Sequence, residues 1–586
     1  MSAKDNQLRV VSFEPNLVQI EIVDFNKWKQ EDTSSEIKLG SVLKIDDGDN
    51  NNIMCLVKSF KMVDDTDTHE TVSSEESYRG KFILNTQPIG KIENSKFKRG
   101  INDISIPPNG ISVASSQELK LIYQVQGNAT LDFASHRLDE NIDIISDGNK
   151  LFSKHLAVVG STGSGKSCTV AKVIQELEKK PDELGQRNNT HVLIFDIHGE
   201  YKEAFPNSNY LSIENKSLLI PYWLMNSEEL EDLFIESGDS NSYNQVSQFK
   251  FAVTQNKKRH NPDRDDITYD SPVYFDIKEV YNYIRNKNYQ THYVENGNEY
   301  LAIQGEKPIL ASDFDNHFWN ELPFEKANAS KSTVFKEKIT KGGGFTGEFE
   351  RFLSRIETKL ADDRLQFILD TTNESDENPK ELLCYLKKLI GYEYTKENNI
   401  TIIDLSSIPF EIVSIVVSIT SRLLFDFSYL KTKLLKENDT PFMVVYEEAH
   451  KYIPKNNESR FRNTRIAVER IAKEGRKYGL SAMIVSQRPS ELSSTVFSQC
   501  TNFIIMRLTN PDDQSYVKRL LPEASIGFGD ELSSLEQREA LLVGDAFTTP
   551  IVAKIKEANP TPKSEDINFY SLWQEEWKDV EFDELF

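Results

Sequence analysis

Residues 160–167 read Gly-Ser-Thr-Gly-Ser-Gly-Lys-Ser, which matches the phosphate-binding loop pattern G-x-x-x-x-G-K-[S/T]. An apolar run at 156–159 precedes this loop, and a helix-forming stretch at 169–178 follows it. The order strand, loop, helix surrounds a phosphate with backbone N–H groups and a helix N-terminus. The sequence therefore predicts a site for a nucleoside triphosphate.

Nine consecutive residues are expected to surround this nucleotide: Gly160, Ser161, Thr162, Gly163, Ser164, Gly165, Lys166, Ser167 and Cys168. Lys166 would neutralise phosphate charge, and Ser167 would bind Mg²⁺. A chance Gly/Ser loop is the alternative, and the correct flanking elements argue against it.

Composition sets limits on the class of protein. The chain has 586 residues, enough for several domains, and a net charge of −23, which argues against a surface that coats nucleic acid as a whole. Its four cysteines show no C-x-x-C spacing, so neither a disulfide framework nor a zinc site is indicated. No apolar run reaches membrane-spanning length and residues 1–10 lack a signal-peptide core, so we expect a cytoplasmic protein without membrane contact.

Two kinds of patterning divide the chain. Short β-prone runs at 18–23, 53–57, 81–84, 111–114 and 119–125 alternate with acidic loops and predict a small β-barrel or sandwich. From about residue 150, strand and helix alternate, with strands expected at 156–159, 192–196, 400–405, 442–446, 482–486, 502–506, 540–543 and 551–555. This pattern predicts an α/β fold with a mostly parallel sheet. Residues from about 205 to 395 interrupt it as a mainly helical insertion.

Two adjacent carboxylates end the apolar strand expected at 442–446. Glu447 and Glu448 follow it directly, as a Walker B element requires, and a parallel strand would deliver both beside the phosphate loop. We assign Glu447 to the shell of Mg²⁺ and Glu448 to the general base that activates water. An exposed Glu pair that merely closes a strand is the alternative.

Two further strands end in polar residues at the same expected edge. Asp196 would hold a water on Mg²⁺ or orient the phosphate loop, although an Asp at a strand end also serves as a helix cap. Gln487 would contact the γ-phosphate or the attacking water and report hydrolysis. Its alternative is a cap on the turn that Pro489 fixes.

Residues 451–477 carry nine basic and three acidic groups within an acidic chain. Lys451, Lys455, Arg460 and Arg462 are candidates for DNA-phosphate contacts in a channel. Another cation of the segment would reach a neighbouring γ-phosphate as an arginine finger. A solvated helix face is the remaining alternative.

Several motifs in order resemble one known family. They are GSTGSGKS with Thr169, DIHGEY at 196–201, YEEAH at 446–450, ERIAKEGRKYGL at 469–480 and SQRP at 486–489. Residues 220–234, 352–364 and 403–413 add to the likeness, which covers roughly 80–555 and resembles the HerA branch of the FtsK/HerA ring ATPases. Cys168, where the family often has Asn, and Glu447 in place of Asp are modest departures.

The resemblance implies an architecture and a set of roles. The expected domains are an N-terminal β-barrel (1–130), a RecA-like P-loop NTPase core in two parts (131–205 and 396–555), a mainly helical insertion (206–395) and an acidic tail (556–586) that is solvated or braces a neighbouring subunit. The resemblance also implies ATP and Mg²⁺ as cofactors and a homohexamer with double-stranded DNA in its pore. Arg476 is the implied arginine finger, with Arg470 in reserve.

The predicted function is an ATP-driven double-stranded DNA translocase or helicase. By resemblance it would partner a NurA-like nuclease, another nuclease or a sirtuin-like NAD-consuming effector docked on the barrel, in anti-phage defence or DNA end processing. One alternative is an ATPase platform that assembles and activates an effector with little translocation. A monomeric kinase or nucleotide switch is a third class, which leaves the insertion motifs and the basic segment unexplained.

Overall fold

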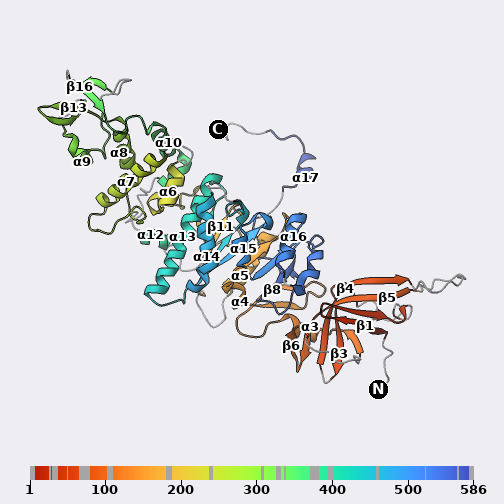
Figure 1. The fold of residues 1–586 in the computed structure, drawn as a ribbon. Helices are drawn as coiled ribbons and strands as arrows, with labels where there is room; N and C mark the ends of the chain where they lie inside the picture. Colours follow the sequence, from red (N-terminus) through yellow and green to blue (C-terminus); the bar gives the residue numbers. More distant parts are fainter. Residues whose placement is uncertain are drawn as a thin grey trace.

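The structure is a computed structural model of the chain. It describes residues 7–25, 28, 37–48, 51–64, 80–101, 110–179, 188–235, 242–304, 309–324, 332–335, 338–369, 382–392, 400–456, 461–521, 523–563 and 567–579. Figure 1 shows three parts in a row: a β-rich N-terminal part, a central α/β part and a mostly helical part at the far end. No helix in these ranges is long and apolar enough to cross a membrane.

The N-terminal part is an antiparallel sheet that rolls into a half-barrel. In the described residues its order is β1-β2-β5-β4-β3-β7, with β6 paired to β5. Its strands are β1 (Leu8–Glu14), β2 (Leu17–Ile22), β3 (Val42–Gly48), β4 (Asn51–Asp64), β5 (Gly80–Glu93), β6 (Lys96–Arg99) and β7 (Gly110–Val113). Alternating apolar residues such as Val18, Ile20 and Ile22 fill the inside of this sheet, as period-two patterning requires.

The central sheet carries the candidate site. Its order in the described residues is β12-β17-β11-β18-β19-β10-β20-β21-β22-β8-β9, parallel from β12 to β20 and antiparallel beyond. The parallel strands are β10 (Leu156–Val159), β11 (Val192–Asp196), β12 (Asn209–Leu211), β17 (Ile400–Asp404), β18 (Phe442–Tyr446), β19 (Leu480–Ser486) and β20 (Asn502–Met506). The others are β8 (Thr130–His136), β9 (Asp143–Asp147), β21 (Glu539–Val543) and β22 (Ile551–Ile555).

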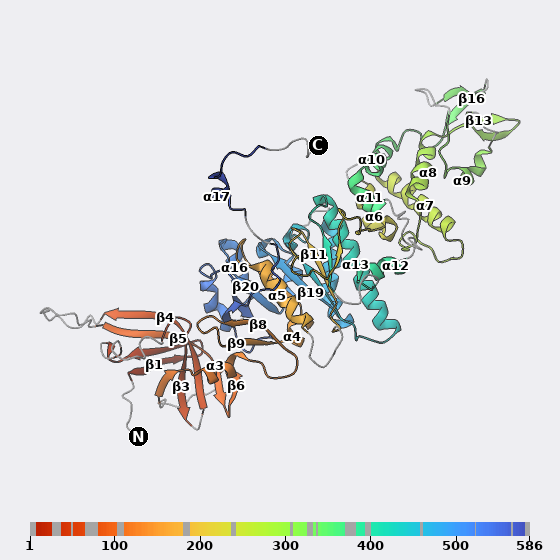
Figure 2. The ribbon, with the colours of Figure 1, turned by 180° about the vertical axis from the view of Figure 1, so that it is seen from behind.

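Helices cover both faces of this sheet. The connection from β10 to β11 crosses the sheet in one direction, and the connections from β17 to β18 and from β18 to β19 cross it in the other. Because such connections are right-handed, the helices of the two sets lie on opposite faces of the sheet. Figure 2 accordingly brings α5 (Lys166–Glu178) forward in the view from behind. The other helices of this part are α4 (Gly148–Ser153), α13 (Phe410–Leu434), α14 (Arg462–Glu474), α15 (Ser494–Ser498) and α16 (Pro511–Leu520).

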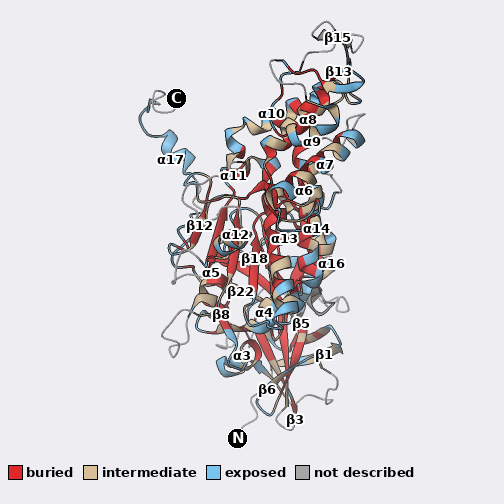
Figure 3. Cartoon of the chain, turned by 90° about the vertical axis from the view of Figure 1, so that its left-hand side faces the viewer, coloured by how far each residue is buried: buried red, intermediate tan, exposed pale blue. Residues whose placement is uncertain are grey.

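Burial follows from this layering. Strands β10, β11, β17, β18 and β20 are buried at every position, and Figure 3 shows buried residues along the central strands. A parallel sheet covered on both faces requires such continuous apolar runs. The structure confirms the expected α/β fold with a mostly parallel sheet, an N-terminal barrel-like sheet and a helical insertion.

The insertion contains more than helices. Its helices are α6 (Ser227–Phe234), α7 (Ser242–His260), α8 (Ile277–Tyr289), α9 (Phe314–His317), α10 (Glu350–Leu360), α11 (Gln366–Leu369) and α12 (Leu382–Leu389). A small antiparallel sheet lies at its tip, formed by β13 (Thr291–Glu295), β14 (Asn298–Leu301), β15 (Ser332–Phe335) and β16 (Lys338–Gly342). The sequence analysis did not predict this sheet.

One expected strand is a helix instead. The run at 119–125 falls largely in α3 (Ser116–Tyr123), so its assignment to a strand was wrong. Ser115 caps this helix by accepting from the backbone N–H of Glu118, whose side chain accepts from the backbone N–H of Ser115. This reciprocal capping box satisfies two backbone donors that would otherwise lack partners, and it favours the helix.

After residue 563, whose backbone N–H still donates to the Glu200 carbonyl, the described chain leaves the body of the molecule. Helix α17 (Phe569–Trp573) and the residues around it are exposed and project outward in Figures 1 and 2. Tyr570, Trp573 and Trp577 are among the exposed aromatic residues of this tail.

Candidate nucleotide site

The phosphate loop joins β10 to α5 at the carboxyl edge of the sheet. Gly163 and Gly165 have φ of 72° and 98°, in the left-handed region that glycine adopts without strain. A Cβ on Gly160 would lie 2.6 Å from Ser164 Oγ, so a larger residue does not fit there. Gly165 is the N-cap of α5 and provides no side-chain cap, which leaves the N–H groups of the first turn available to a phosphate.

Segments remote in sequence hold this loop from behind. The backbone N–H of Ser161 donates to the Arg507 carbonyl over 2.7 Å, and its hydroxyl lies 3.1 Å from the Thr509 hydroxyl. The backbone N–H of Arg538 donates to the Ser164 carbonyl over 3.0 Å. Sequence reasoning missed these supports because no short-range pattern links residues more than 300 positions apart.

Lys166 is the buried cation of the site. Its Nζ lies 3.3 Å from the Ser161 carbonyl, within the loop. Burial lowers the pKa of Lys166, while the carboxylates of Glu448, Glu447 and Glu200 act in the opposite direction. The ammonium group therefore sits between a phosphate-sized cradle and three carboxylates, where it can bind an anion.

Asp196 and Glu447 fasten the turn that follows β11. Asp196 accepts from the backbone N–H groups of Glu200 at 3.1 Å and Tyr201 at 2.9 Å, and Glu447 accepts from that of Ile197 at 2.9 Å. Burial raises the pKa of both carboxyl groups. The charge of Asp196 raises the pKa of Glu447 further, whereas a hydrogen bond with Glu447 lowers that of Asp196. Both carboxylate oxygens of Asp196 thus accept hydrogen bonds from backbone N–H groups. This arrangement corresponds to the alternative role of Asp196 as a cap on the backbone that follows its strand.

Glu200 is a site residue that the sequence analysis did not single out. Asp196 holds its backbone, and its carboxylate is close enough to Lys166 and Glu447 to influence the pKa of both. Among the residues that the structure describes, its Oε2 has no hydrogen-bond partner. The DIHGEY element contained this Glu, but an isolated Glu after a strand carries no spacing signal.

Glu448 has an unusual backbone conformation. Its φ and ψ are 45° and 43°, the left-handed region, which costs a non-glycine residue about 1–2 kcal/mol. Its side chain is 6% exposed, and its Oε2 has no hydrogen-bond partner within the described ranges. Strain of this kind persists where the surrounding structure fixes a side chain for a task.

Gln487 reaches the phosphate loop directly. Thr162 Oγ1 donates to Gln487 Oε1 over 2.6 Å, so the end of β19 contacts the exposed tip of the loop. This contact places the Gln487 amide beside the loop, and its role as a residue that reports hydrolysis stays a prediction.

These residues fit a nucleotide with Mg²⁺. The glycine cradle and the open N-terminus of α5 suit phosphates, and Ser167 and Glu447 would hold the metal. No group of three or more His, Cys, Asp or Glu in the described residues could hold a metal ion alone. Mg²⁺ is usually bound by one or two protein groups together with substrate phosphates, which is the part expected of Ser167 and Glu447.

Three of the four candidate DNA-binding residues lie in described parts of the chain after β18. Lys451 lies in the turn after β18, where its Nζ is 3.4 Å from His198 Nε2, and Arg462 at the start of α14 is 4.0 Å from Glu228 of the insertion. Lys455 is exposed in the intervening loop, and Arg460 lies outside the described residues.

Arg476 lies at the opposite edge of the sheet from the phosphate loop. It belongs to the turn at Gly475–Tyr478 that enters β19, whereas Gln487 follows the end of that strand. The seven residues of β19 span about 20 Å, which no side chain bridges. Arg476 is exposed, and the described residues give its guanidinium no ion pair.

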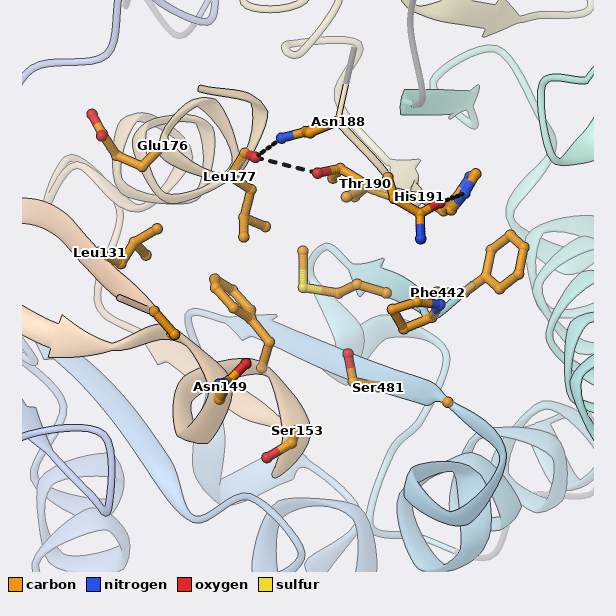
Figure 4. A pocket seen from close by; sticks show the side chains of 18 of the residues that line it. Leu131, Asn149, Ser153, Glu176, Leu177, Asn188, Thr190, His191, Phe442 and Ser481 are labelled. Carbon is orange, nitrogen blue, oxygen red and sulfur yellow. Dashed lines mark hydrogen bonds between the residues drawn. The ribbon is translucent and has the colours of Figure 1, made fainter. Parts of the chain in front are cut away.

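A pocket of about 570 Å³ adjoins Arg476 at this amino edge. Leu131, Leu177 and Phe442 form apolar parts of its wall, with Asn149 and Thr190 among the polar parts (Figure 4). Leu177 accepts hydrogen bonds from Asn188 and Thr190, which close one side.

Arg470, the reserve finger, is engaged within its own chain. Its guanidinium lies 4.1 Å from the centre of the Phe425 ring, and Nη1 is 3.3 Å from Asp426. These contacts make Arg470 less available to a neighbouring copy than Arg476.

Comparisons with known proteins agree with this geometry. Residues 134–424 match the family model described as "Helicase HerA, central domain". The chain is 27% identical over 474 residues to the "DNA double-strand break repair helicase HerA" of Saccharolobus solfataricus, covering 80% of this chain and 75% of that protein. It is 25% identical over 538 residues to the "Probable DNA double-strand break repair helicase HerA" of Methanocaldococcus jannaschii, covering 88% and 93%.

A solved structure, VirB4 of Thermoanaerobacter pseudethanolicus, is similar with a TM-score of 0.43 and 13% identity, covering 74% of this chain and 98% of that one. The family model, the HerA relatives and the P-loop geometry together give the family and the reaction. Residues 134–424 of this chain are a central domain of the HerA helicase family, and the chain is an ATP-hydrolysing enzyme.

Proposed function

We propose that the chain is a homohexameric motor that uses ATP to move double-stranded DNA through a central pore. The observation that carries this proposal is that the candidate site residues lie at two opposite edges of one sheet. Lys166 and Glu448 lie at the carboxyl edge, while Arg476 lies about 20 Å away at the amino edge. A head-to-tail ring brings these two edges together at every subunit boundary.

Each residue has a proposed role in turnover. Gly160–Ser167 and Cys168 surround the nucleotide, and Lys166 balances the charge of its phosphates. Bound Mg²⁺, held by Ser167 and Glu447, would supply neutralisation of the charge that develops on the phosphate oxygens.

The remaining groups act on the water and on the geometry. Glu448 accepts the proton of the attacking water, and Gln487 registers the state of the phosphate loop through Thr162. Asp196 keeps the turn at 197–201 in place. Arg476 of the next subunit stabilises the leaving phosphate charge.

DNA would contact the cations that follow the Walker B strand. Lys451, Lys455, Arg460 and Arg462 are the proposed phosphate contacts, and they act without reading sequence. Weakened ATPase stimulation in the Lys455→Ala variant, with basal activity kept, is the expected sign of such a contact.

The N-terminal sheet is the proposed docking place for a nuclease or NAD-consuming effector, in anti-phage defence or DNA end processing. Phe60 and Met62 are about half exposed and share one face of β4, which Figure 1 shows extending together with β5 beyond the other strands of the sheet. The tail expected at 556–586, whose described residues 567–579 are exposed, would brace an adjacent subunit. A platform that only assembles an effector remains the alternative function.

Native mass measurement and ATPase assays test the motor. With a non-hydrolysable ATP analogue and duplex DNA, we expect six copies per complex, and with ATP we expect turnover that rises with DNA and falls with salt. A species of one 67.2 kDa chain under all conditions, or an ATPase rate indifferent to DNA at every salt concentration, contradicts the proposal.

A further inference from the structure

His450 lies between the proposed general base and the end of the sensor strand. It follows Glu448 in the turn at Ala449–Lys451, and its Nδ1 is 3.3 Å from Glu448 Oε2 and 3.2 Å from Ser486 Oγ. The His450 side chain is 10% exposed, and Ser486 is fully buried. The histidine is therefore enclosed by the site, and water does not screen its contact with Glu448.

Glu448 needs such a contact. A base that removes a proton from water must be held at the reacting atom in its ionised form. Its Oε2 has no hydrogen-bond partner among the described residues, so the approach of His450 Nδ1 is the contact that can become one. Hydrogen bonds in catalytic sites are often long without substrate and tighten when substrate binds.

Ser486 determines what the imidazole can do. Its Oγ accepts from the backbone N–H of Arg488 over 3.0 Å, which leaves the hydroxyl one lone pair and one hydrogen for His450. When Nδ1 carries the proton, it can donate to Glu448 and to that lone pair. Burial is the largest effect on the pKa of His450, and it lowers that pKa. The charges of Lys451 and Arg488 lower it further, whereas those of Glu448 and Glu491 raise it. The neutral ring, which carries one N–H, is therefore favoured.

The same strand end also touches the phosphate loop. Gln487 follows Ser486 directly and accepts from Thr162 of the loop. A continuous series of contacts thus runs from Thr162 through Gln487, Ser486 and His450 to Glu448.

We infer that His450 is a positioning residue that holds the Glu448 carboxylate toward the attacking water and ties it to the Ser486–Gln487 end of β19. The inference rests on the proposed role of Glu448 as general base. His450 itself touches neither substrate nor metal in this arrangement; it donates from Nδ1 and fixes where the carboxylate points.

Three substitutions at one position test the inference. The amide nitrogen of Asn overlays Nδ1 of His, whereas that of Gln overlays Nε2. We expect His450→Ala and His450→Gln to lower kcat about 10- to 100-fold, with the KM for ATP and the affinity for a non-hydrolysable analogue nearly unchanged. His450→Asn should recover most of kcat. The exposed His198, which contacts neither Glu448 nor Ser486, provides the matched control His198→Ala.

Each outcome decides one point. The three variants at His450 could also lose kcat equally, bind nucleotide more weakly and have a lower Tm. That result would show that the histidine is only structural, and it would overturn the inference. Wild-type kcat in His450→Ala also overturns it, provided that Glu448→Gln is inactive, and the proposed function then stands. If Glu448→Gln itself turns over normally, the proposed base is wrong and the inference falls with it.

A double substitution adds a second readout. Because His450 acts through Glu448, His450→Ala should cause no further loss of the small residual rate that a Glu448→Gln background keeps in single-turnover measurements. An additional loss equal to that of the single variant shows that the two residues act independently, and it refutes the inference.

Discussion

Mixed rings of two inactive variants probe the division of the active site most directly. Glu448→Gln removes the base at the carboxyl edge, and Arg476→Ala removes the cation at the amino edge of the same sheet. Since β19 separates these edges by about 20 Å, one folded copy cannot supply both groups to one nucleotide. Each variant alone should bind ATP and fail to turn it over.

The expected recovery follows from the arrangement of a head-to-tail ring. A boundary is complete when an Arg476→Ala copy holds the nucleotide and a Glu448→Gln copy provides the arginine. Random mixing in equal amounts makes about one boundary in four complete, so ATPase activity should approach a quarter of the wild-type rate if boundaries act independently. Activity should fall symmetrically when either variant is in excess.

Co-expression of the two variants with different tags, followed by tandem purification, ensures that both are present in each ring. The matched control pairs Glu448→Gln with Lys166→Ala, because these two groups belong to the same half of the site and no boundary can combine them. The reasoning is refuted if the Arg476→Ala mixture shows only the residual activity of its components at every ratio, or if the control mixture recovers equally.

The remaining predictions concern single positions. Lys166→Ala should abolish nucleotide binding in a titration with a fluorescent ATP analogue, because the cradle then has no cation facing its phosphates; retained affinity would contradict this role. Arg422→Leu should lower the free energy of unfolding by about 3–5 kcal/mol in urea, because it leaves the Glu229 carboxylate, 1% exposed, without its cation at 2.8 Å. Adding Glu229→Leu should recover most of this loss, and no recovery would show that the pair is not coupled. Burial raises the pKa of Glu178 to about 7 in the folded protein, from about 4.5 in the unfolded chain. The stability that the protonated Glu178 carboxyl contributes is therefore fully present below pH 4.5 and is lost as the pH rises through 7. Glu178→Gln should therefore raise Tm at pH 8 and leave it unchanged near pH 4.5, and an equal effect at both values would exclude this cause.

The buried strands of the core could be predicted because their environment leaves a local record. Strands β10, β11 and β18 are covered on both faces, so their residues are apolar except for Asp196, the last residue of β11. The residues at their carboxyl ends could be placed together for the same reason. Parallel strands end at one edge, where Lys166, Glu447 and Gln487 were expected.

The missed elements had weaker but real local signals. Helix α3 begins with Ser115 and Glu118 in the S-x-x-E spacing of a capping box, which outweighs the β-prone composition that follows. The hairpin of β13 and β14 turns at Asn296 and Gly297, both with positive φ, as an Asn-Gly turn favours. Their strands are short, and the surrounding helical periodicity concealed them.

The sequence by itself determined the chemistry of this protein, because the phosphate loop and the two carboxylates after β18 are encoded within a few consecutive residues. Only the tertiary structure decided which side chains act together. Asp196 proved to be occupied by the backbone of its own turn, Glu200 and His450 proved to face the site, and Arg476 proved to lie at the far edge. The physical reason is that these contacts join the ends of strands far apart in the chain, and strand order and register, rather than local pattern, set their distances.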